Sequence, residues 1–145
     1  MTSEDSPGSE LDALLGAALR IAQQHLAEAA SFEPFVLVMG SDGRMLSAEV
    51  DRSEIGTHPE SEEIADAATA QLRGLAASVR ATALTLGVRL AKERSDAIEV
   101  RLENRDGVAL LVLLPYRRPR FGGRIEYGDV RTFRGAHDIW PAALS

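Results

Sequence analysis

The first part of the chain has apolar residues at every third or fourth position, the spacing of an amphipathic helix. Ser9 suits the N-cap position, and Glu10 follows in the first turn, where the helix dipole favours a carboxylate. Pro34 is incompatible with a continuing helix, so the helix must end before it. We expect this helix to cover a core with one apolar stripe, formed by Leu11, Leu14, Leu15, Ala18, Ala22, Leu26 and Ala29.

A β-hairpin is predicted directly after this helix. Residues 35–40 are almost wholly apolar and indicate a buried strand, and Ser41–Arg44 contains an Asp-Gly turn signal. Residues 45–50 then form the returning strand. The two strands are expected to pair in an antiparallel sheet.

A second helix is predicted after a polar connection. Thr57 and Glu60 have the spacing of a capping box, and the carboxylates of Glu62 and Glu63 follow in the first turn. The next apolar residues are three or four positions apart, which places them on one helix face. That face comprises Ile64, Ala68, Leu72, Leu75 and Val79.

Strict alternation replaces the helical spacing in the second half of the chain. Residues 83–90 and 98–103 alternate between apolar and other positions, so each segment is predicted to be a strand. The charged face of the second strand is expected to be solvated; it carries Glu99, Arg101 and Glu103.

Two further strands and a tail complete the predicted sheet. Residues 108–114 are apolar at every position, so we expect a central strand that is covered on both faces and ends at Pro115. Residues 125–133 are predicted to be a last strand, interrupted at Gly128. The tail that follows contains Trp140, which we expect to dock on the core.

These elements predict an α+β fold, with two helices packed on one side of an antiparallel sheet of five or six strands. Their order is α-β-β-α-β-β-β-β. A chain of 145 residues fits a single domain. We assign that domain to residues 9–145 and expect residues 1–8 to form a disordered tail.

The element order and the Asp-Gly hairpin at residues 36–50 resemble the roadblock/longin family of small regulatory domains. The resemblance covers roughly residues 10–114, and the last strand and the Trp140 tail depart from the family pattern. It implies dimerisation and contact with a partner of the small-GTPase type. The alternative is an uncharacterised bacterial α+β family.

Composition agrees with a soluble protein, since 45% of the residues are apolar and 26% are charged. The longest apolar run, residues 108–114, is far shorter than the ~20 residues of a membrane-spanning helix. The acidic N-terminus resembles neither a secretory signal nor a transit peptide. The chain has no cysteine, which agrees with a reducing compartment. We therefore expect a cytoplasmic protein that does not associate with membranes.

Charge is divided unevenly along the chain. Residues 1–66 have three Arg against fourteen acidic residues, or −11, and residues 67–145 have twelve Arg and one Lys against eight, or +5. The asymmetry indicates either an anionic partner or two halves that attract each other. An excess of +5 is modest for a nucleic-acid-binding protein, so a nucleic-acid partner is not expected. The scarcity of Lys beside Arg is typical of a GC-rich bacterial genome.

Candidate chemistry is sparse. The densest acidic cluster lies at the predicted start of the second helix, where dipole compensation already explains it. The three histidines form no pair with metal-ligand spacing, and there is neither a Gly-x-Ser-x-Gly elbow nor a phosphate loop. We predict no catalytic residue, no metal and no cofactor.

The loop after residue 116 is the best candidate for a binding surface. Its guanidinium groups suit phosphate or carboxylate oxygens, and its phenylalanine could stack on a base or pack against a partner. The alternative is a solvated loop whose charges pair with the acidic half of the chain. The residues are Arg117, Arg118, Arg120, Phe121 and Arg124. A second, aromatic group could form an interface or simply belong to the core; it consists of Tyr116, Tyr127 and Trp140.

Two classes of function remain open. The first is a non-enzymatic protein-interaction or regulatory domain that presents a helix face or a sheet edge, from the first hairpin or the last strand, to another protein or to a second copy of itself. A toxin-immunity protein with an acidic binding face is a variant of this hypothesis. The second is a domain that binds a small anion, either a nucleotide or a phosphorylated metabolite, through the arginine loop. An enzyme is a third hypothesis for which the sequence names no reaction.

Overall fold

The computed structural model describes residues 7–50, 61–120 and 122–141. The predicted capping box at Thr57–Glu60 and the predicted site residue Phe121 lie outside these ranges. The elements are α1 (Pro7–Glu28), β1 (Phe35–Gly40), β2 (Met45–Glu49), α2 (Ser61–Leu75), β3 (Val79–Leu90), the 3-10 helix η2 (Ala91–Glu93), β4 (Ser95–Asn104), β5 (Ala109–Arg117), β6 (Glu126–Tyr127) and β7 (Arg131–Arg134).

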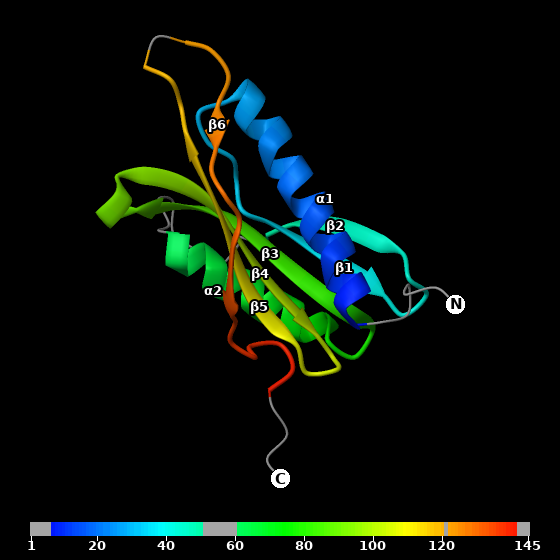
Figure 1. Cartoon of the computed structure of the whole chain (residues 1–145). Helices are drawn as coiled ribbons and strands as arrows, with labels where there is room; N and C mark the ends of the chain where they lie inside the picture. Colours follow the sequence, from blue (N-terminus) through cyan, green and yellow to red (C-terminus); the bar gives the residue numbers. More distant parts are fainter. Residues whose placement is uncertain (1–6, 51–60, 121, 142–145) are drawn as a thin grey trace.

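The strands form one antiparallel sheet in the order β2-β1-β3-β4-β5-β6, and β7 also pairs with β5 (Figure 1). The α+β class and the element order predicted from the sequence are confirmed. The sheet has seven strands because the predicted last strand is divided into β6 and β7. Tyr127 faces Tyr116, whereas Arg131 faces Leu113, so one extra residue is accommodated between the two pairs. The interruption at Gly128 is thus confirmed, and the Gly128 N–H donates to the carbonyl of Pro115 at 2.8 Å.

The two helices lie on opposite faces of the sheet, so the prediction that both cover one side is wrong (Figure 1). Leu37 and Met39 of β1 belong to the core beneath α1, while Val36 and Val38 belong to the core beneath α2. Successive strand residues point to opposite faces. A strand that is apolar at consecutive positions therefore needs cover on both sides, which the two helices provide.

Both helices differ from their predicted bounds. Helix α1 begins at Pro7, before the predicted cap at Ser9 and inside the segment expected to be disordered. Helix α2 ends at Leu75, and Val79 is the first residue of β3 rather than part of the helical face. The chain turns between these two residues, where the N–H and the hydroxyl of Ser78 both donate to the Leu75 carbonyl.

Two predictions about the inner strands are also wrong. Strand β5 continues through Pro115 to Arg117, and its face toward α2 is only partly covered, with Leu111 and Leu113 half-buried. The charged face of β4 is not solvated, because α2 and the C-terminal tail lie over it. Glu103 on this face is only 4% exposed.

Candidate functional site

The arginine loop links β5 to β6, and Arg118 in it has a structural role. Its guanidinium donates to the backbone carbonyl of Leu26 at 2.8 Å and to that of Ala29. The last carbonyls of a helix have no partner within the helix, so this side chain caps the C-terminus of α1. Arg118 therefore joins the loop to the first helix and has fewer donors left for an external anion.

The remaining loop arginines do not act as one group. Arg117 donates to the Glu93 carbonyl of η2 at 3.3 Å. Arg120 and Arg124 are exposed. Two of the four predicted anion ligands are thus bound to backbone carbonyls of the protein itself.

The predicted aromatic group is divided between the two faces of the sheet. Tyr116 is buried in the core beneath α1, with its ring centroid 6.1 Å from that of the half-exposed Tyr127. Burial and the nearby carboxylate of Asp96 raise the pKa of Tyr116. Trp140 packs against the core beneath α2, and its indole N–H donates to the carbonyl of Ala76 at 3.2 Å. The docking of the tail is confirmed, and the three aromatics do not form a single patch.

A shallow pocket of about 320 Å³ lies beside Tyr116, Tyr127 and Arg117. The Glu93 carboxylate on its wall accepts two hydrogen bonds from Arg131, at 2.6 and 2.9 Å. These bonds lower the pKa of Glu93 and raise that of Arg131. One anion and one cation of the pocket walls, Glu93 and Arg131, are thereby paired with each other.

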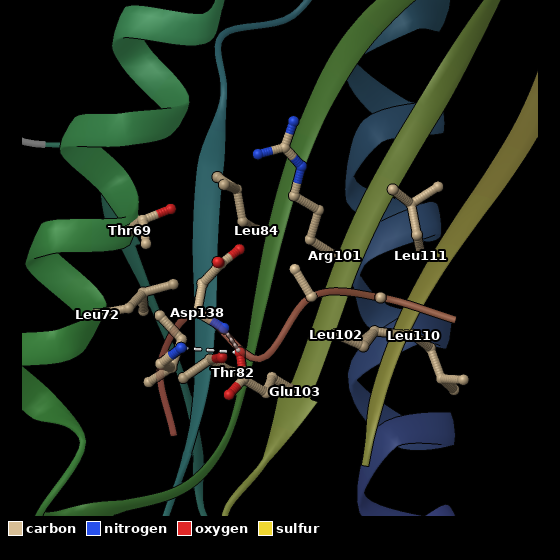
Figure 2. A pocket seen from close by; sticks show the side chains of 13 residues that line it. Thr69, Leu72, Thr82, Leu84, Arg101, Leu102, Glu103, Leu110, Leu111 and Asp138 are labelled. Atoms are coloured by element: carbon tan, nitrogen blue, oxygen red, sulfur yellow. Dashed lines mark hydrogen bonds between the residues drawn. The ribbon is translucent and has the colours of Figure 1, made fainter. Parts of the chain in front are cut away.

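A second pocket of about 190 Å³ lies between α2, the sheet and the C-terminal tail (Figure 2). Arg101 lines its upper part and donates to Glu99 at 2.7 Å and to Glu62 of α2 at 3.2 Å. Burial disfavours the charged guanidinium, but these carboxylates outweigh that effect and raise the pKa of Arg101. The cation of this pocket is therefore neutralised by the protein's own carboxylates.

Glu103 anchors the tail at the lower end of this pocket (Figure 2). One carboxylate oxygen accepts the backbone N–H groups of Asp138 and Ile139, both at 2.9 Å, and the other accepts that of Trp140 at 2.6 Å. Arg73 of α2 strengthens the attachment by donating to the Asp138 carbonyl at 2.6 Å. This role of Glu103 was not predicted from the sequence, because an alternating charged residue is ordinarily solvated and its partners are 35 to 37 positions away.

At the open edge of the sheet, β2 pairs with β1 and with no other strand among the described residues. The Gly40 N–H donates to the Arg44 carbonyl at 2.8 Å, so these two residues form a hydrogen-bonded pair. Hydrogen-bonded pairs alternate along an antiparallel ladder. Leu46 and Ala48 therefore also bond to β1, and the backbone groups of the intervening residues point away from the sheet. These outward residues are Met45, Ser47 and Glu49.

Within β2 itself, the one charged side chain that can protect the edge is that of Glu49. The strand contains neither proline nor a basic residue, four of its five residues are exposed, and Leu46 is 62% exposed. One outward group has a partner within the described residues: the Glu49 carbonyl accepts from the Gln71 side chain at 3.2 Å. The opposite edge differs, since β7 is short, begins and ends with arginine, and follows the interruption at Gly128.

Metal binding finds no support in the part of the chain that the structure describes, where no three His, Cys, Asp or Glu side chains gather into a candidate ligand set. Neither described helix combines the length and the apolar composition that crossing a membrane requires.

No protein-family model matches the chain, and no curated protein or solved structure resembles it at a significant level. The resemblance to roadblock/longin domains therefore stays a prediction that rests on element order and one turn.

Proposed function

We propose that this protein is a non-enzymatic interaction domain that binds another polypeptide by pairing a strand with the open edge at β2. The observation that carries the proposal is the combination of outward backbone groups at Met45, Ser47 and Glu49 with an exposed Leu46 in an edge strand that has no basic residue or proline. In β-augmentation, such main-chain groups supply affinity and alternate side chains supply specificity.

The other candidate surfaces have less support. The arginine loop uses Arg118 to cap α1 and Arg117 to hold η2. In the pocket beside α2, Arg101 and Glu103 are bound to Glu99 and to the tail backbone. These polar groups serve the fold, whereas among the described residues one outward backbone group of β2, the Glu49 carbonyl, has a partner.

The proposal is tested by blocking the edge without disturbing the core. Ser47→Pro removes an N–H that points away from β1, a position at which edge strands tolerate proline. Ser47→Ala is the matched control because it keeps that N–H. The wild type and both variants are used as baits in lysate of the native host, and retained proteins are identified by mass spectrometry.

A protein that is retained by the wild type and Ser47→Ala but lost with Ser47→Pro supports the proposal. Equal retention by all three baits contradicts it and directs attention to another surface. An Arg120→Ala/Arg124→Ala variant, which leaves the capping Arg118 intact, tests the loop in the same assay.

A further inference from the structure

Strand β2 is complementary to itself in one antiparallel register, and we infer that two copies of this protein pair through it as a two-fold symmetric dimer. This inference rests on the proposed function, since it names the partner that the open edge binds. Such a dimer requires a single arrangement that pairs the outward backbone groups, places matching faces of the two sheets side by side and opposes no like charges.

Symmetry restricts the arrangement. A two-fold axis perpendicular to the sheet makes the two strands antiparallel and keeps the α1 face of one copy beside the α1 face of the other. Residues that face each other must then lie on the same side of the sheet. Ser47 lies on the α1 side, since it is paired with Leu37 of that core, and Leu46 lies on the α2 side, opposite Val38.

One register pairs all five residues of β2 under these conditions. Ser47 faces Ser47 of the partner subunit, and Met45 faces Glu49 of the partner subunit. The outward residues of both strands then meet as three hydrogen-bonded pairs with six N–H···O bonds in all. In two of these bonds the acceptor is a Glu49 carbonyl, which also accepts from the Gln71 side chain of its own copy. A shift of the register by two residues leaves part of each strand unpaired.

The side chains agree with this register. On the α2 face, Leu46 lies against Ala48 of the partner subunit, so the exposed leucine of each copy gains an apolar neighbour. On the α1 face, each Glu49 lies opposite Met45 of the partner subunit. Like charges in directly opposite positions would destabilise the pair, and this register has none within β2. A groove of about 470 Å³ separates α1 from β2 and leaves the α1 side of the strand open.

The other edge is a poorer site for self-pairing. Strand β7 has four residues, of which Arg131 and Arg134 are the first and last. A two-fold register that keeps facing residues on the same side of the sheet pairs at most three of these four residues, compared with all five in β2. The two edges therefore differ in charge and length, and β2 offers the longer self-paired strand.

The dimer is expected to be weak. A five-residue strand pair buries less than the roughly 1,000 Å² of a typical stable interface, so we expect a Kd of roughly 10–100 μM. Self-association is measured by sedimentation velocity and light scattering from about 1 to 500 μM, a range chosen to span that Kd. Ser47→Pro should weaken the dimer at least about 30-fold, because the Ser47 N–H groups of both copies bond at the two-fold axis and both are removed. Ser47→Ala should leave the Kd of the dimer unchanged.

Two further variants keep the test decisive if Ser47→Pro fails to fold. Leu46→Lys keeps every backbone group and should also weaken the dimer. Ser47→Cys places two thiols at the axis, where paired Cα atoms lie about 5.5 Å apart and an added oxidant such as diamide can link them as a disulfide. The chain has no native cysteine, so a rapid disulfide-linked dimer of Ser47→Cys, with none for Thr132→Cys in β7, reports this register.

The outcomes separate the inference from the proposed function. Concentration-dependent dimers that are lost with Ser47→Pro or Leu46→Lys support both. A wild type that stays monomeric at the highest concentration overturns self-pairing. The proposed function still stands in that case if the wild-type bait retains a protein from lysate that the Ser47→Pro bait does not retain. A dimer that is unaffected by both variants overturns self-pairing through β2.

Discussion

The carboxylate of Glu103 offers the sharpest test of how the C-terminal tail is held. It accepts three backbone N–H groups from Asp138, Ile139 and Trp140 while only 4% exposed. Glu103→Gln keeps the shape of the side chain but presents an amide N–H₂ where one oxygen accepted a hydrogen bond. At least one hydrogen bond to the tail is therefore lost, and the side-chain amide N–H₂ then faces a backbone N–H of the tail, so that two donors oppose each other.

The expected cost follows from the charge of the acceptor. Hydrogen bonds to a charged group contribute about 1.5–3 kcal/mol each, so the loss of one bond should lower the free energy of unfolding by about 2 kcal/mol. For a domain of 145 residues, that loss corresponds to a decrease in Tm of roughly 5–8 °C.

Trp140 provides the assay because it is the only tryptophan of the chain. Urea unfolding is followed by its fluorescence and by circular dichroism, with the exposed Glu126→Gln in β6 as the control. We expect a lower urea midpoint and a red-shifted native emission for Glu103→Gln only. Unchanged stability and emission in Glu103→Gln would refute the idea that this carboxylate anchors the tail.

Three further predictions concern the packing around the sheet. Gly135→Ala should destabilise the domain, because the added Cβ would lie 2.9 Å from the backbone of β5, and the change is read as a lower Tm. Arg118→Ala should cost about 1–2 kcal/mol by removing the α1 cap, while the exposed Arg120→Ala should leave urea unfolding unchanged; equal effects would contradict the capping role. The pKa of Glu93 should lie below its ordinary value of 4.5 and return toward it in Arg131→Ala, as measured by carboxyl NMR titration. A lowered folded-state pKa stabilises the fold above pH 4.5, and this contribution is lost as the pH falls through that pKa.

Local signals predicted much of the fold. The Asp-Gly turn of the first hairpin is confirmed, with Gly43 at a φ of 84°, a conformation that glycine adopts without steric cost. The turn before β5 has the same feature, with Gly107 at a φ of 97°. Alternating apolar residues identified β3 and β4, and Gly128 marked the break in the last strand. Each of these features depends on residues that are neighbours in the sequence.

Features that depend on distant residues could not be predicted in the same way. The spacing of apolar residues shows that a helix has a buried face, but it does not specify which side of the sheet that face covers. The alternating pattern predicts that Glu103 is solvated, whereas in the structure the C-terminal tail covers it. The edge position of β2 follows from the pairing of β1 with β3, which no local pattern specifies.

The central claim is that the outward backbone groups of β2 bind a second polypeptide, and amide hydrogen exchange tests it most directly. In dilute protein, the N–H groups of Leu46 and Ala48 should be protected by β1, whereas those of Met45, Ser47 and Glu49 should exchange quickly. At high protein concentration, or with a captured partner, the N–H groups of Met45, Ser47 and Glu49 should also become protected. All five amides of β2 should then exchange slowly. Association that leaves the three outward amides in fast exchange would contradict the claim.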